Sequence, residues 1–143
     1  MTADRERIEL LLARTDPSAL LPARRAQEAA RIELPIELVS CAPLDAIGGE
    51  RWFVIVRDRR GVLYGVPCVI EGDVLRRALP GDGAAEALLR MLATPGQGRA
   101  GDSISITRWF AEPCAGERGF DVDQTNELVV VGERAVVKWL LHP

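Results

Sequence analysis

RWFVIVRDRRGVLYGVPCVI, residues 51–70, is the stretch that decides the fold class. Its two runs, Arg51–Arg57 and Val62–Ile70, are rich in β-branched and aromatic residues, which favour strands. The residues between them, Asp58–Gly61, end in glycine and are typical of a hairpin loop. Because so short a connection joins only antiparallel strands, the stretch predicts an antiparallel hairpin at the centre of the protein.

The segment before this hairpin predicts a further strand, Arg31–Leu38. Every second residue is apolar, namely Ile32, Leu34, Ile36 and Leu38. Strict alternation is typical of a half-buried strand. Pro35 cannot donate to a ladder, so we expect an edge strand here. A fourth strand is predicted over Ser103–Phe110, where Ile104 and Ile106 share one face.

Helical spacing of apolar residues predicts helices over Asp4–Arg14, Ser18–Ala30 and Ala84–Ala93. In the last of these, Ala85, Leu88, Leu89 and Leu92 should face the core. The expected fold class is therefore α+β, with an antiparallel sheet of about four strands and packed helices.

The sequence pattern changes after residue 110. Ala111–Gly119 is typical of a linker, and Glu127–Val131 and Ala135–Leu141 predict two strands of a β-hairpin. We therefore expect a first unit over residues 1–110, a linker over 111–121 and a separate hairpin unit over 122–143. A lone hairpin is marginal in water, so this one must pack on the first unit or on another part of a longer protein.

Composition excludes several classes of function. The net charge of −3 argues against a nucleic-acid partner, because such proteins carry a basic stripe. The charged start, MTADRERIEL, and the lack of a long apolar run predict a cytoplasmic protein without a membrane partner. The widely spaced Cys41, Cys68 and Cys114 and the single His142 predict neither a metal site nor a catalytic cysteine.

Lys138 is the one unusual residue of the C-terminal hairpin. It lies among Val136, Val137, Trp139 and Leu140, so it either extends from an edge strand into water or points into a ligand site. Protein kinases use the second arrangement, with a strand lysine that binds ATP phosphates and a loop that covers them.

Residues 122–140, VDQTNELVVVGERAVVKWL, carry a specific resemblance. Gln124-Thr125-Asn126, Val129–Val131, Gly132-Glu133 and Val137-Lys138-Trp139 follow in an order and spacing that resemble the start of the kinase lobe in bacterial maltokinases and actinobacterial glucosamine kinases, which are aminoglycoside-phosphotransferase-like sugar kinases. Leu21-Pro22-Ala23-Arg24 more loosely resembles part of the N-terminal cap of that family, although Arg25-Ala26-Gln27 replaces its Arg-Trp-Phe. The resemblance implies a cystatin-like cap on residues 1–110.

By this resemblance, Lys138, Gln124, Thr125 and Asn126 would contact ATP phosphates in an intact kinase. Such a kinase also needs an acidic partner for the lysine, a catalytic aspartate and magnesium ligands, all of which lie downstream of the lysine strand. The resemblance therefore implies a non-catalytic N-terminal region of an ATP-dependent maltose- or glucosamine-type sugar kinase. This chain would hold no cofactor of its own, ATP and magnesium would be used by the parent protein, and the remainder of the kinase would be its partner.

Three alternatives stay open at this stage. A free-standing interaction or regulatory module would expose an apolar hairpin face made of Val129, Val131, Val137 and Leu141, and would self-associate through it. A small-molecule binding α+β domain would use a pocket between helix and sheet. A complete enzyme of another type would draw on loop carboxylates, of which Asp45, Asp73 and Asp82 are the candidates.

Overall fold

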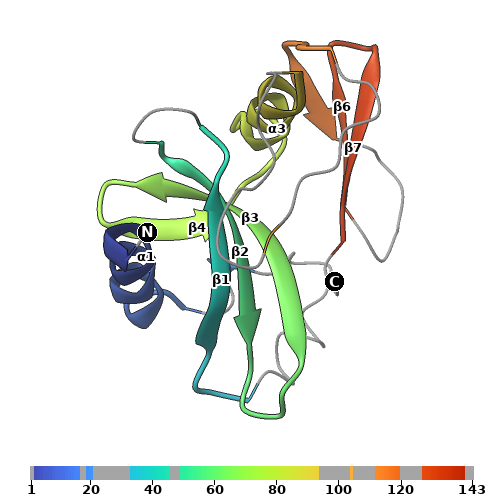
Figure 1. Ribbon diagram of the computed structural model, residues 1–143. Coiled ribbons are helices and arrows are strands. Elements are labelled where there is room, and N and C mark those ends of the chain that lie inside the picture. Colours follow the sequence, from blue (N-terminus) through green and yellow to red (C-terminus); the bar gives the residue numbers. More distant parts are fainter. Residues whose placement is uncertain are drawn as a thin grey trace.

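The computed structural model describes residues 2–16, 19–20, 33–45, 49–93, 104, 112–119 and 127–140. Within this part of the chain the protein is an α+β fold of two helices and two antiparallel sheets, which confirms the predicted class (Figure 1). The helices are α1 (Thr2–Ala13) and α3 (Ala84–Ala93). The first sheet contains β1 (Glu37–Pro43), β2 (Arg51–Arg57), β3 (Leu63–Glu71) and β4 (Val74–Arg77), and the second contains β5 (Glu117–Gly119), β6 (Glu127–Val131) and β7 (Ala135–Trp139).

The four-stranded sheet is a meander in the order β1-β2-β3-β4. The predicted hairpin is its centre, with Arg57 opposite Leu63 and Trp52 opposite Cys68. Strand β4 was not predicted, because it is short and follows β3 after a two-residue turn in which Gly72 has a φ of 64°. Left-handed backbone of this kind suits glycine.

Asp58 organises the turn between β2 and β3. It is 4% exposed, and its Oδ1 accepts the backbone N–H groups of Arg60 and Val62. Its Oδ2 accepts the Arg60 guanidinium at 2.8 Å and the Tyr64 hydroxyl at 3.4 Å. Burial raises the pKa of Asp58, but these hydrogen bonds outweigh it and hold the pKa below its ordinary value. The carboxylate therefore stays ionised and closes the turn.

One face of this sheet packs on α1. Ile8 and Leu11 of the helix are buried against Val54, Val66 and other residues of β2 and β3. Arg5 extends from α1 to donate to the carbonyl oxygens of Leu38 and Val39 in β1. Since side chains alternate across a strand, the neighbouring residues Phe53 and Val69 point to the opposite face of the sheet.

The opposite face packs on α3 and on the β5–β7 sheet (Figure 1). Ala85 and Leu89 of α3 are buried there, together with the inward residues of the C-terminal strands, Val129, Val131, Val137 and Trp139. The expected exposed apolar hairpin face is therefore wrong for its three described members, which are at most 6% exposed, because they pack in one cluster with α3 and the four-stranded sheet. Leu141 lies outside the described residues.

The strand predicted over Arg31–Leu38 is misplaced. It begins at Glu37, which pairs with Arg57, the last residue of β2, and it continues to Pro43. Residues before Glu37 have no β2 residue opposite them, and Pro35 has no N–H to offer a ladder. Leu34, which should have faced the core, is 58% exposed. Strand β1 is nevertheless an edge strand, as Pro35 indicated.

The predicted linker over residues 111–121 contains β5, which pairs with β6 through Glu117 opposite Val131 and Gly119 opposite Val129. The C-terminal strands thus form a three-stranded sheet rather than a lone hairpin. The helix predicted over Ser18–Ala30 and the strand predicted over Ser103–Phe110 lie almost wholly outside the described residues.

Candidate functional site

Lys138 lies on β7 with its side chain exposed, whereas its neighbours Val137 and Trp139 are buried. It therefore points away from the core, on the outer face of the β5–β7 sheet. Leu128 of β6 is its cross-strand partner. Val136 and Leu140, two residues before and after it, are 58% and 48% exposed. The Lys138 ammonium group thus has the exposed apolar side chains of Val136 and Leu140 as neighbours on this face of the sheet.

The order of the strands places Lys138 on the third strand of an antiparallel meander, β5-β6-β7. The segment that joins β5 to β6 is residues 120–126, and it contains the other predicted site residues, Gln124, Thr125 and Asn126, which lie outside the described residues. In protein kinases the loop over the phosphates joins the first two strands of the lobe and the lysine is on the third. Sequence reasoning missed β5, because three residues are too few to show alternation.

The buried side of β7, opposite Lys138, packs against the four-stranded sheet. Trp139 stacks on Phe53 of β2, with ring centroids 5.8 Å apart and planes 19° from parallel. A Cβ atom at Gly65 of β3 would lie 3.0 Å from the Phe53 ring and 3.1 Å from the Leu140 carbonyl oxygen. Glycine at this position therefore lets the end of β7 approach the four-stranded sheet closely.

The β6–β7 turn has two residues with positive φ, Gly132 at 59° and Glu133 at 54°. Val131 pairs with Ala135, so the connection has three residues, and the Arg134 N–H donates to the Val131 carbonyl oxygen at 3.2 Å across the two left-handed residues. A Cβ atom at Gly132 would lie 3.1 Å from the Ala115 carbonyl oxygen, so the segment before β5 packs closely on the turn. Arg118 of β5 forms an ion pair with Glu133 across the sheet.

A second contact joins β5 to the N-terminus of α3. Glu117 Oε1 accepts the backbone N–H groups of Gly81 and Gly83, at 2.8 and 3.0 Å, and its Oε2 accepts that of Glu86 at 2.9 Å. Glu86 in turn accepts the N–H of Gly116 at 2.7 Å. The C-terminal sheet is therefore tied to the first unit by polar contacts as well as by apolar packing.

The loop before α3 is held by Asp82. Its carboxylate accepts the Arg76 guanidinium at 2.7 and 3.1 Å and the Leu79 N–H at 2.7 Å. The hydrogen bonds from Arg76 are the main cause that lowers the pKa of Asp82 below its ordinary value, against partial burial. Arg51 donates to the Asp82 carbonyl oxygen and also pairs with Asp45.

Replacing Asp82 with asparagine is expected to lower the free energy of unfolding by about 1–3 kcal/mol at pH 7, because Arg76 loses a charged acceptor. Glu71→Gln is the matched control, since Glu71 also pairs with Arg76 but is 69% exposed, and it should cost about 0–1 kcal/mol. The folded-state pKa of Asp82 lies below its unfolded value of about 3.9. The difference in free energy of unfolding between wild type and D82N, measured by urea titration, should therefore reach its maximum above that pH. It should shrink as the pH falls through the folded-state pKa. A difference that grows toward acid pH would contradict this.

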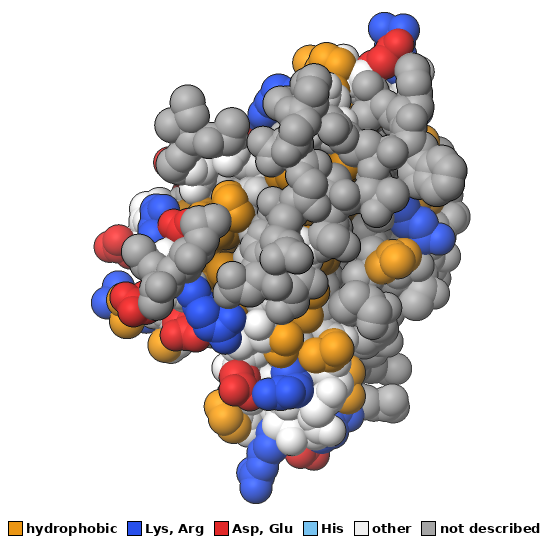
Figure 2. Space-filling view, in the orientation of Figure 1, with side chains coloured by type: hydrophobic (Ala, Val, Ile, Leu, Met, Phe, Trp, Pro, Cys, Tyr) orange, Lys and Arg blue, Asp and Glu red, His pale blue; other side chains and the backbone are white. Residues whose placement is uncertain are grey.

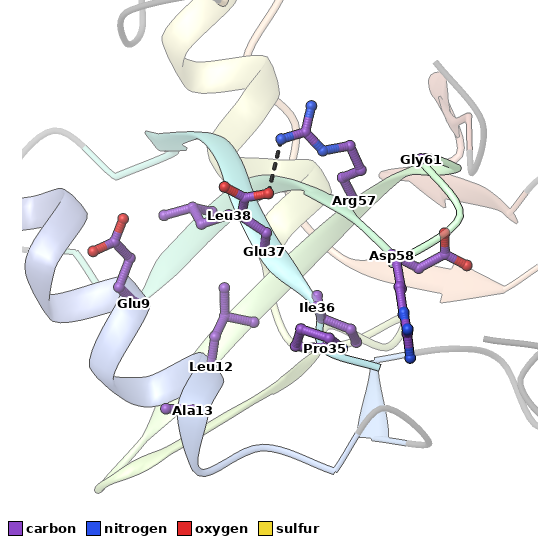
Figure 3. Close-up of a pocket in the computed structure, with 11 residues that line it drawn as sticks. Glu9, Leu12, Ala13, Pro35, Ile36, Glu37, Leu38, Arg57, Asp58 and Gly61 are labelled. Atoms are coloured by element: carbon purple, nitrogen blue, oxygen red, sulfur yellow. Dashed lines mark hydrogen bonds and ion pairs between the residues drawn. The ribbon is translucent and has the colours of Figure 1, made fainter. Parts of the chain in front are cut away.

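A groove of about 520 Å³ lies elsewhere, between α1, the start of β1 and the β2–β3 turn (Figure 3). Leu12, Ile36 and Leu38 supply apolar lining, and these residues belong to the α1 side of the four-stranded sheet. The groove is thus on the opposite side of that sheet from Lys138.

The carboxylates that line this groove are all paired. Glu9 forms an ion pair with Arg5, Glu37 forms one with Arg57, and Asp58 forms one with Arg60. Hydrogen bonding to Arg57 lowers the pKa of Glu37. The lowered pKa makes Glu37 and Asp58 poorly suited to general acid catalysis, which needs a pKa near the working pH.

Other acidic residues give no support to a separate catalytic centre. Asp45 and Asp82 are both bonded to arginine, and Asp73 is exposed at the β3–β4 turn. In the described part of the chain, no three His, Cys, Asp or Glu side chains gather to hold a metal ion.

Acidic and basic side chains are intermixed over the described residues of the face seen in Figure 2. No described helix combines the length and the apolar character that crossing a membrane requires.

Comparison with known proteins relates the chain to sugar kinases. The glucosamine kinase of Streptacidiphilus jiangxiensis is 41% identical over 135 residues, which are 92% of this chain and 30% of that protein. The glucosamine kinase of Mycolicibacterium smegmatis (strain ATCC 700084 / mc(2)155) is 44% identical over 98 residues, 67% of this chain and 24% of that protein. No protein-family model matches the chain.

Solved structures agree with the sequence matches. A glucosamine kinase in complex with glucosamine, ADP and inorganic phosphate superposes with a TM-score of 0.70 at 36% identity, over 92% of this chain and 27% of that one. A glucosamine kinase in crystal form A gives a TM-score of 0.71 at 37% identity, over 94% of this chain and 29% of that one. The chain thus spans less than a third of the length of these relatives, and over that span its sequence and fold are similar to theirs.

Proposed function

We propose that this chain is the non-catalytic cap region and the first strands of the kinase lobe of an ATP-dependent sugar kinase of the glucosamine type. The observation that carries the proposal is the position of Lys138, exposed on the third strand of the β5-β6-β7 meander. The kinase relationship is independent support, since relatives and similar structures are glucosamine kinases, one of them with ADP bound.

In the proposed kinase, Lys138 supplies positive charge to the phosphates of ATP. Gln124, Thr125 and Asn126 cover the phosphates from the segment between β5 and β6. Leu128 and Val136 flank the lysine with apolar surface on which the nucleotide base can rest. Val136, Lys138 and Leu140 are exposed on this face, where a ligand and a second lobe can reach them, whereas Val130 on the same face is buried.

Phosphoryl transfer also requires groups that this region does not supply. In the kinase architecture the acidic partner of the lysine, the catalytic aspartate and the magnesium ligands follow the lysine strand. Transfer depends on their positioning and on charge stabilisation. The chain therefore performs no transfer by itself, and the remainder of the kinase is its partner.

A chimera tests the proposal. Residues 1–143 replace the matched segment of the Streptacidiphilus jiangxiensis glucosamine kinase, and glucosamine-dependent ADP release is measured. The chimera should phosphorylate glucosamine, whereas the isolated chain and the relative without its matched segment should not. Turnover by the isolated chain, or a folded chimera without activity, would refute the proposal.

A further inference from the structure

The groove in Figure 3 leaves apolar surface open on the α1 side of the four-stranded sheet. Leu12 of α1 and Ile36, just before β1, both line it, and each is only partly buried where it packs on the core. Pro35 and the exposed Ala13 extend this lining. Its volume of about 520 Å³ lies within the range of roughly 300–1,000 Å³ that is usual for sites of small ligands. The groove is therefore large enough for one small molecule with an apolar body.

The charged side chains around the groove leave one positive charge in excess. Its described carboxylates each form an ion pair with an arginine, namely Glu9 with Arg5, Glu37 with Arg57 and Asp58 with Arg60. Arg59 is the remaining charged residue of the described lining. Its side chain is exposed, and no carboxylate in the described part of the chain forms an ion pair with it. The guanidinium of Arg59 is therefore available to an anionic ligand.

Hydrogen bonds hold the backbone that presents Arg59. The N–H of Arg59 donates to the Glu33 carbonyl oxygen at 2.8 Å, which ties the β2–β3 turn to the segment before β1. The buried Asp58 carboxylate accepts two hydrogen bonds from the Arg60 guanidinium, at 3.0 and 2.8 Å, so the neighbouring cation is already engaged within the turn. A ligand that pairs with Arg59 therefore meets a backbone that needs little ordering, which lowers the entropic cost of binding.

We propose that this groove binds a small carboxylic acid with an aliphatic body. The carboxylate pairs with the Arg59 guanidinium, which can donate two parallel N–H···O bonds to it, and the aliphatic body covers the open surface of Leu12 and Ile36. A cationic ligand would gain less, because each described carboxylate of the lining already has its own arginine. The groove lies on the opposite side of the four-stranded sheet from Lys138, so this site is separate from the proposed ATP surface and does not depend on it.

Titration of the 143-residue chain with sodium octanoate, followed by its backbone amide signals in NMR, tests this inference. Octanoate should shift the amides of residues 12–13, 36–38 and 57–61. Acetate, which lacks the apolar body, and 1-octanol, which lacks the charge, should each bind at least about tenfold more weakly. Arg59→Gln should weaken octanoate binding by a factor on the order of ten, since a charge-assisted pair is lost. Arg7→Gln is the matched control, because Arg7 is an exposed arginine of α1 that does not line the groove, and it should bind octanoate as wild type does.

A second variant fills the groove without removing any core side chain. Ala13 is exposed at the end of α1 and lines the groove, so Ala13→Glu adds bulk and a negative charge there. It should weaken octanoate binding by more than about tenfold, while the thermal midpoint stays within about 4 °C of wild type.

Three results would overturn the inference at different points. An absence of shifts around the groove at millimolar octanoate would overturn the site itself. Binding of 1-octanol as tight as that of octanoate, or equal losses in R59Q and R7Q, would overturn the pairing of the carboxylate with Arg59. Tighter binding of N-acetyl-leucine, which carries the carboxylate of a peptide C-terminus, would overturn the assignment to a free aliphatic acid.

Discussion

Replacing Trp139 with alanine is expected to lower the free energy of unfolding by about 3–5 kcal/mol. Trp139 is 8% exposed and stacks on Phe53, so it joins the C-terminal sheet to β2 of the first unit. Its removal deletes a large apolar side chain, and the surrounding backbone is held by β-ladders on both sides and cannot collapse to fill the space. No other described aromatic pair joins the two sheets in this way.

Urea unfolding followed by circular dichroism measures this loss. Val136→Thr is the matched control on the same strand, because Val136 is 58% exposed and threonine keeps the β-branched shape, and it should change the free energy by less than about 0.5 kcal/mol. A loss below about 1 kcal/mol in W139A would show that the two sheets are not one cooperative structure.

Replacing Lys138 with alanine in the chimera should lower kcat/KM for ATP by a factor on the order of 10²–10³, the size expected when a charged group that faces the transferred phosphoryl group is removed. The fold should be unaffected, because the lysine side chain is exposed. The thermal midpoint of K138A should therefore equal that of wild type, which separates loss of chemistry from loss of structure.

Arg134→Ala is the control for this measurement. Arg134 is also an exposed cation of the β6–β7 unit, with its side chain 71% exposed in the turn and paired with Glu112. Its removal changes the net charge by the same amount and should leave kcat/KM within about twofold, because exposed ion pairs contribute little. Equal losses of kcat/KM in K138A and R134A would indicate a general effect of net charge and would contradict the placement of Lys138 in the ATP site.

Elements with long, regular patterns were predictable from the residues alone. Strand β2 and helix α3 have the predicted bounds, since Arg51–Arg57 is a run of β-branched and aromatic residues between two arginines and Ala84–Ala93 follows the helical period. The short strands β4 and β5 were not predicted, because a few residues show no period and pair only where a neighbouring strand offers a partner. Strand β1 was displaced for the same reason, since its start depends on where β2 ends.

The direction of Lys138 could not be decided from its neighbours. Both faces of β7 carry apolar residues, with Val137 and Trp139 on one side and Val136 and Leu140 on the other. Alternation states which residues share a face but not which face is covered. The four-stranded sheet and α3 bury the side of Val137 and Trp139, and Lys138 is left exposed.

The sequence by itself determined the α+β class, the central hairpin and helix α3, because strand and helix periods are local properties of a chain. The candidate residues Lys138, Gln124, Thr125 and Asn126 came from the resemblance of residues 122–140 to a kinase motif, and their roles remain predictions. Only the tertiary structure showed that β5 joins the C-terminal sheet, so that Lys138 lies on its third strand. Only the tertiary structure showed that Glu117 caps helix α3, which begins more than thirty positions earlier in the chain. Such contacts depend on the spatial approach of distant segments. A carboxylate that completes a distant helix terminus leaves no periodic signal in its own surroundings.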